Sequence, residues 1–162
     1  CITLLPSFFL LTPGLDAPQA VGPYLNNVFP ATLQTSLTTE NAFPGLTFYE
    51  PTQIIKYPGQ NKLTVACKNG IIWIFNNDPA VTTKTAFLDI TAKVKDFNDG
   101  GLLSFVYHPE FGVPTSPNRG YIYLWYRYIP NQAHTGDEAY MRLSRFTLAD
   151  GATSILSSSE YV

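Results

Sequence analysis

The chain has 162 residues, of which 45% are hydrophobic and only 14% charged, and its formal net charge at pH 7 is −2. This balance is too apolar for a disordered chain. It also contains no cluster of Lys and Arg that could neutralise a nucleic-acid backbone, so nucleic-acid binding is not expected. The charge fits a neutral small molecule or another protein surface. Aromatic residues reach 14%, with 13 Pro and 11 Gly, which favours short strands joined by turns.

The first residues indicate export. Residues 2–12 form an apolar run that is shorter than the roughly 20 residues needed to span a hydrocarbon core. The run and the small residues after it, around Ala17 and Ala20, match a secretory signal with its cleavage region. We therefore expect residues 1–20 to be a signal-peptide remnant, a secreted or periplasmic (bacterial) location, and no stable membrane span. A buried N-terminal strand is the alternative.

Residues 21–45 are rich in Pro, Asn and Thr without a sustained period, which predicts a linker before a folded domain over 46–162. Four short strands open that domain. Alternation of apolar side chains and turn-forming clusters predict them over 52–57, 62–67, 70–75 and 85–90. Asn69-Gly70 predicts a tight hairpin between the second and third strands. Four antiparallel strands of this length have the size of one blade of a β-propeller.

Three further strands are predicted over 102–108, 120–128 and 140–148, and residues 91–96 could hold one helical turn. In the last strand Arg142 and Arg145 are out of phase with strict alternation, which would fit either a bulge or a strand end near Ser144. No segment has a sustained helical period. The fold class predicted is all-β, covering about one and a half to two blades of antiparallel meander.

Cys67 lies in an alternating strand segment, on the same face as Leu63 and Val65. This pattern predicts a buried structural thiol. The sequence has no CxxC pair and no His/Cys spacing of the kind that binds zinc.

Four segments, taken in order along the chain, resemble the glucose/sorbosone dehydrogenase family. They are the G-x-I-hydrophobic strand at 69–75, the segment Asp99-Gly100-Gly101-Leu102-Leu103 with its following His108-Pro109-Glu110-Phe111, the aromatic strand at 118–126, and the R-x-S-R-F strand at 141–146. The resemblance covers about residues 46–162. It implies the N-terminal part of a six-bladed β-propeller that continues beyond this chain.

The resemblance also implies an activity. Enzymes of the family use pyrroloquinoline quinone (PQQ) with calcium to oxidise the anomeric hydroxyl of aldoses, and they pass electrons to an acceptor. Their general-base His lies beyond the R-x-S-R-F strand, so no catalytic residue is expected in this chain, and the chain alone is expected to be inactive. The alternative is a non-catalytic extracellular binding module, because propellers such as the hedgehog-interacting proteins share the fold without the chemistry.

One site residue is carried over from the resemblance. Asp99 stands where quinone-binding members have a Gln or Glu that reaches toward the cofactor; Asp is shorter, and a turn-capping role for Asp99 is the alternative. His108 is expected to hydrogen-bond to nearby backbone, and His134 to be a solvated loop residue. Asp78, Asp89 and Asp96 lack the spacing of an EF-hand calcium loop and are expected in solvated turns.

An aromatic stripe, Tyr121, Tyr123 and Trp125, lies on one face of the predicted strand 120–128. Such a stripe could stack on sugars, but large side chains also fill the space between propeller blades. We expect the second role.

Overall fold

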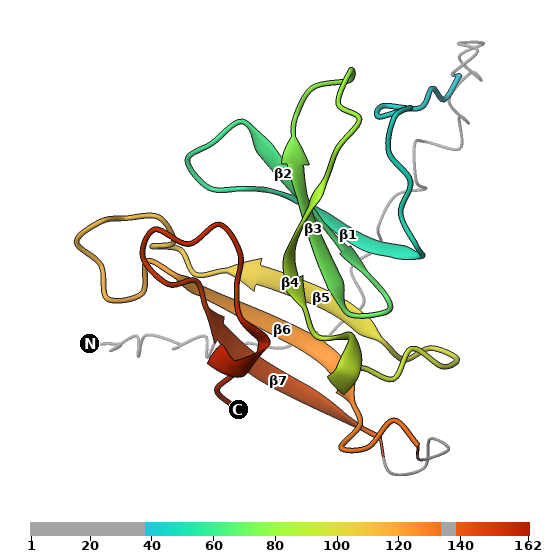
Figure 1. The fold of residues 1–162 in the computed structure, drawn as a ribbon, viewed down its shortest axis with the longest axis vertical. Helices are drawn as coiled ribbons and strands as arrows, with labels where there is room; N and C mark the ends of the chain where they lie inside the picture. Colours follow the sequence, from blue (N-terminus) through green and yellow to red (C-terminus); the bar gives the residue numbers. More distant parts are fainter. Residues whose placement is uncertain (1–37, 134–138) are drawn as a thin grey trace, which may run out of the picture. The chain divides into compact units, whose positions relative to one another are not determined.

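Two antiparallel sheets build the described part of the chain, residues 38–133 and 139–162 of this computed structural model (Figure 1). The first sheet has the order β1-β2-β3-β4, with β1 (Pro51–Lys56), β2 (Lys62–Cys67), β3 (Ile71–Asn76) and β4 (Thr85–Asp89). The second has the order β5-β6-β7, with β5 (Leu102–Tyr107), β6 (Tyr121–Tyr128) and β7 (Tyr140–Thr147). Short 3₁₀ turns follow β4 (η2, Thr91–Lys93) and β7 (η3, Ser157–Ser159). The predicted all-β class is confirmed, and the first sheet is a complete four-stranded meander of the blade type.

Strand β3 shows why its sequence is apolar throughout. Ile72 and Ile74 belong to the core between the two sheets, whereas Trp73 and Phe75 belong to a second core on the opposite face of the first sheet. A strand covered on both sides has no reason to alternate with polar residues. The predicted hairpin before β3 is also present, and of its two turn residues only Gly70, at φ 99°, has a left-handed backbone.

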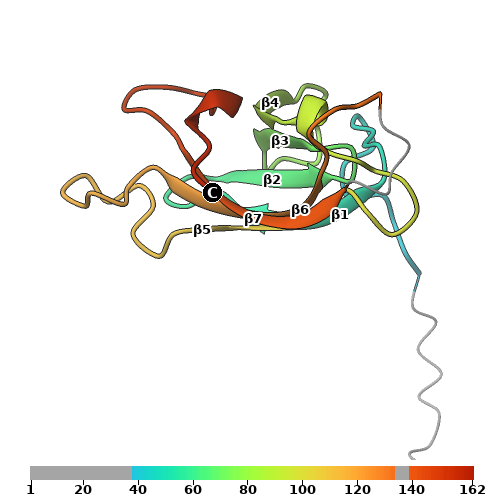
Figure 2. The ribbon, with the colours of Figure 1, turned by 90° about the horizontal axis from the view of Figure 1, so that it is seen from below.

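The inner faces of the two sheets form the main core. Figure 2 views the second sheet almost edge-on, with β2, β3 and β4 on one side of it together with the C-terminal segment. Side chains that alternate along β6 show the same asymmetry, because Ile122, Leu124 and Tyr126 are fully buried against the first sheet and the residues between them are not. The buried residues of this core that come from the second sheet are Leu102, Phe105, Ile122, Leu124, Tyr126 and Phe146.

Neither the bulge nor the strand end considered near Ser144 is present, so both alternatives are wrong. Strands β6 and β7 pair without interruption from Tyr121↔Thr147 to Tyr128↔Tyr140. Strict alternation therefore places Arg142 on the inner face, where its guanidinium stacks 3.3 Å from the centroid of the Tyr128 ring. Irregularities occur instead where β1, β4 and β5 pair with their neighbours, and the sequence did not indicate them.

Residues before β1 pack on the outer face of the first sheet. Phe43 meets Phe75 edge-on with ring centroids 5.2 Å apart, and Leu46 is buried in the same cluster. The expected signal segment, residues 1–20, and the linker up to residue 37 lie outside the described residues. Among the residues that the structure does describe, no helix is long and apolar enough to cross a membrane.

Candidate functional site

Strands β1 and β5, each at one edge of its sheet, are linked by side-chain hydrogen bonds. Gln53 on β1 accepts a hydrogen bond from the backbone N–H of Phe105 at 2.8 Å. One residue earlier, the hydroxyl of Thr52 donates to the carbonyl of Leu102 at 3.0 Å. These bonds pair a side chain of one sheet with the free backbone edge of the other. The starts of β1 and β5 consequently lie at the same end of the two sheets.

Asp99 lies at this shared end, in the turn Asn98–Gly101 that leads into β5. Its side chain is exposed. Two residues of the turn have left-handed backbones, Asn98 at φ 52° and Gly101 at φ 109°. The N–H of Gly100 donates to the carbonyl of Phe97 at 3.1 Å, which closes the turn. Asp99 therefore presents its carboxylate to solvent from a tightly wound connection.

The Asp99 turn is held from both sides. The carbonyl of Lys68, in the β2–β3 hairpin, accepts the N–H of Leu102 at 2.8 Å, and the N–H of Arg127 on β6 donates to the carbonyl of Gly101 at 2.9 Å. The approach is so close that a Cβ on Gly101 would lie 2.4 Å from the Lys68 carbonyl oxygen. Only glycine fits there, and a Cβ on Gly100 would likewise lie 2.8 Å from the Lys95 carbonyl oxygen, which accounts for the Gly-Gly pair after Asp99.

The chemistry available at the turn is limited to hydrogen-bond acceptance. An ionised Asp99 can accept from a hydroxyl or N–H group of a ligand, and it repels the carboxylates of a quinone such as PQQ. For calcium, no three His, Cys, Asp or Glu side chains come together among the described residues.

Of the other aspartates considered from the sequence, Asp78 begins a turn, Asp89 is the last residue of β4, and Asp96 lies in the irregular segment after η2. Asp78 accepts the N–H of Ala80 at 2.9 Å, and Asp89 accepts the N–H and hydroxyl of Thr91 at 2.9 and 2.8 Å. Both are exposed, whereas Asp96 is half-buried. The side-chain acceptance by Asp78 and Asp89 is the usual role of Asp in a turn.

His108 has the structural role expected of it. Its Nδ1 accepts the backbone N–H of Glu110 at 3.1 Å, and its own backbone bonds to the carbonyl of Tyr121 and the N–H of Phe111. Through this hydrogen bond to Glu110, the imidazole stabilises the loop that follows β5. His134 lies outside the described residues.

The aromatic stripe points away from the first sheet. Trp125 is 42% exposed, and Tyr121 and Tyr123 are half-buried. The core between the two described sheets is filled instead by the alternate residues of β6, such as Leu124 and Tyr126. Within the described part of the chain, no second sheet covers the stripe.

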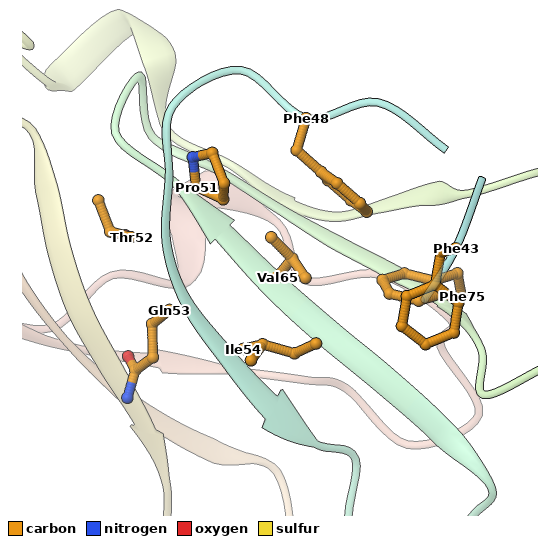
Figure 3. Close-up of a pocket in the computed structure, with 8 residues that line it drawn as sticks. All are labelled: Phe43, Phe48, Pro51, Thr52, Gln53, Ile54, Val65 and Phe75. Carbon is orange, nitrogen blue, oxygen red and sulfur yellow. The ribbon is translucent and has the colours of Figure 1, made fainter. Parts of the chain in front are cut away.

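An apolar cavity of about 400 Å³ opens on the outer face of the first sheet. Figure 3 shows Phe43, Phe75 and Ile54 around it, whereas Gln53 turns away from the aromatic side chains. The remaining lining residues are Phe48, Pro51, Thr52 and Val65. None of the lining side chains is titratable, so the cavity offers packing and no acid–base chemistry.

A buried carboxylate, Glu160, lies at the C-terminal end of the described chain and was missed by sequence reasoning. It accepts hydrogen bonds from Ser144 at 2.7 Å and from the Tyr126 hydroxyl, and it pairs with Lys93 at 2.6 Å and Arg142 at 3.4 Å. Its side chain is 9% exposed. Burial alone would raise the pKa of Glu160, but the hydrogen bonds of Lys93, Tyr126 and Ser144 outweigh it and lower the pKa to about 2.

The Glu160 cluster joins the two sheets. Lys93 follows β4 of the first sheet, whereas Tyr126, Arg142 and Ser144 belong to the second. Nearby, Ile155 forms a parallel bridge to Leu88 at the outer edge of the first sheet. Apart from the Nε of Arg142, which is buried without a hydrogen-bond partner, the charged groups of the cluster are paired with one another, and we assign it a structural role.

The class of protein that these elements define is all-β, built of antiparallel meanders. No family model matches this chain, and no curated protein matches it. Among the solved structures that it resembles, two match at 16% identity over 68% of this chain. One is described as "Crystal structure of glucose dehydrogenase", with a TM-score of 0.48, and the other as "glucose dehydrogenase", with a TM-score of 0.46. The chain spans 28% of the length of the first and 30% of the second.

Proposed function

We propose that this chain is the N-terminal portion of a secreted six-bladed β-propeller that oxidises the anomeric hydroxyl of aldoses with PQQ and calcium. The observation that carries the proposal is the position of Asp99. Propeller blades surround a central channel, and the strands that would line it here are β1 and β5, which the bonds of Thr52 and Gln53 hold together. The Asp99 turn leads directly into β5, one of these two strands.

The residues of this chain would contribute a scaffold and one acceptor. A bound quinone would supply the hydride acceptor for oxidation of the anomeric carbon. Asp99, exposed on a turn that Lys68 and Arg127 hold by backbone bonds, would accept a hydrogen bond from a hydroxyl or N–H group at the channel. The calcium ion is proposed from the family resemblance alone.

The test is an activity assay on the full-length protein. PQQ and calcium are added, and dye reduction is followed with a panel of aldoses. Reduction that falls at least about tenfold in Asp99→Ala, which removes the acceptor, but not in the exposed turn variant Asp78→Ala, would support the proposal. An Asp99→Ala variant as active as the wild-type protein would remove Asp99 from the site, and no reduction with any aldose would refute the enzyme.

A binding module is the second candidate, and the exposed part of the aromatic stripe favours it. Trp125, at 42% exposed, could stack on a sugar ring or a protein side chain. Failure of dye reduction combined with quenching of tryptophan fluorescence by a sugar, lost in Trp125→Ala, would favour this candidate over the enzyme.

A further inference from the structure

Glu50, the residue before β1, has a backbone conformation that residues with a Cβ seldom adopt. Its φ is 37°, in the left-handed region, although it is neither Gly nor Asn. Such conformations persist where the surrounding structure imposes them, and they are concentrated at functional positions. The strain raises the question of what the placement of Glu50 achieves.

Glu50 holds Lys68 by two separate contacts. Its carbonyl accepts the backbone N–H of Lys68 at 3.0 Å, and its carboxylate lies 3.5 Å from the Lys68 ammonium. The Lys68 side chain is 23% exposed, whereas that of Glu50 is 54% exposed. A pair as open as this contributes little to stability. Its main effect is to fix the direction of the Lys68 stem.

The Lys68 stem in turn lies against the Asp99 turn. A Cβ on Gly101 would come within 2.5 Å of Lys68 Cγ, so the stem and the glycine are in direct contact. The Lys68 carbonyl also accepts the N–H of Leu102, the first residue of β5. Contacts therefore run without a gap from Glu50 through Lys68 to the turn that carries Asp99.

We infer that Lys68 is a positioning residue for Asp99, with Glu50 as the group that orients it. The ion pair keeps the stem of Lys68 on Gly101, and the stem keeps the turn in one arrangement, so that the Asp99 carboxylate meets a ligand at a fixed place. The inference rests on the proposed function, because Asp99 serves a ligand only if the propeller binds one.

The experiment measures PQQ affinity in the full-length protein by fluorescence titration, with the thermal midpoint recorded in parallel. Lys68→Met keeps an unbranched stem and removes the ammonium, Lys68→Arg keeps the positive charge, and Lys62→Met is the control at the other end of β2. We expect Lys68→Met to weaken binding about fivefold and Lys68→Arg to restore it to within about twofold. Lys62→Met should bind like the wild-type protein, and the Lys68→Met midpoint should move by less than about 2 °C. Equal affinity of Lys68→Met and the wild-type protein overturns the inference.

A second measurement separates this inference from the proposed function. A nitroxide spin label is attached to Asp99→Cys in a Cys1→Ser background, where the buried Cys67 stays unlabelled. If the wild-type protein binds no PQQ, the proposed function fails and the label decides on Lys68. A label that is immobile with Lys68, mobile with Lys68→Met and immobile again with Lys68→Arg sustains the positioning role. Identical spectra for all three overturn it.

Discussion

The buried carboxylate of Glu160 gives the sharpest test of how the two sheets are held together. Glu160→Gln keeps the shape of the side chain and an oxygen that can accept from Ser144. It removes the negative charge that faces Lys93 at 2.6 Å and Arg142 at 3.4 Å. Two cations would then remain beside a neutral amide in a partly dehydrated site. Leaving a buried charge without its partner is strongly destabilising.

The size of the loss follows from the pKa. The pKa of Glu160 is lowered to about 2 from an ordinary value of 4.5, which corresponds to about 3 kcal/mol of stability supplied by the ionised form. Because the folded-state pKa is the lower one, this stability is complete above pH 4.5 and is lost as the pH falls toward 2. We expect Glu160→Gln to reduce the free energy of unfolding by about 3 kcal/mol at neutral pH. The difference from the wild-type protein should shrink to almost nothing near pH 2.

The assay is urea unfolding, followed by tryptophan fluorescence, at several pH values between neutrality and pH 2. Asp150→Asn is the matched control, because Asp150 also pairs with a cation, Arg119, but its side chain is 71% exposed. That substitution should change the free energy of unfolding very little. The reasoning fails if Glu160→Gln loses no more stability than Asp150→Asn, or if its loss stays constant as the pH falls.

Three further changes test the backbone and the core. Gly101→Ala should cost about 3 kcal/mol or more, because its Cβ would meet a carbonyl at 2.4 Å, whereas Gly59→Ala, with φ 73° and open space around it, should cost about 1 kcal/mol; equal losses in urea unfolding would contradict the close approach. Gln53→Leu should cost about 1–2 kcal/mol by leaving the N–H of Phe105 without its acceptor, and Gln53→Glu, which keeps an acceptor, should cost less in the same assay. The thiol of Cys67 is fully buried and burial raises its pKa, so it should react with a disulfide reagent only as fast as the protein unfolds; immediate reaction of the native thiol would show that it is accessible.

The strands could be predicted from the sequence because their signals are local. Alternation along 62–67 and 140–148, and turn clusters between them, placed all seven strands within one residue of their observed bounds. The fine pairing could not be predicted in the same way. Whether Arg142 causes a bulge depends on partners in other segments, and here the Tyr128 ring and Glu160 accommodate it on the inner face without one.

The candidate site, too, could be predicted from the sequence only in part. Asp99 could be found because it lies within a contiguous segment that resembles a family motif. Its supports could not, since Lys68 and Arg127 reach the turn from other hairpins and act largely through main-chain groups, which carry no side-chain signature. The left-handed backbone of Glu50 could not be predicted either, because Glu seldom adopts that conformation and the sequence carries no signal for it.

Glu160 shows the limit most clearly, since its neighbours come from three separate segments of the chain. In the sequence it follows three serines, a context typical of a solvated loop. In the structure Lys93, Tyr126, Arg142 and Ser144 converge on it, and a carboxylate that would be unremarkable in a loop becomes the connection between two sheets. A charge acquires that role only after both sheets have formed and packed. For this reason Glu160→Gln tests the packing of the sheets, whereas a change within one strand, such as Gln53→Leu on β1, tests a single bond.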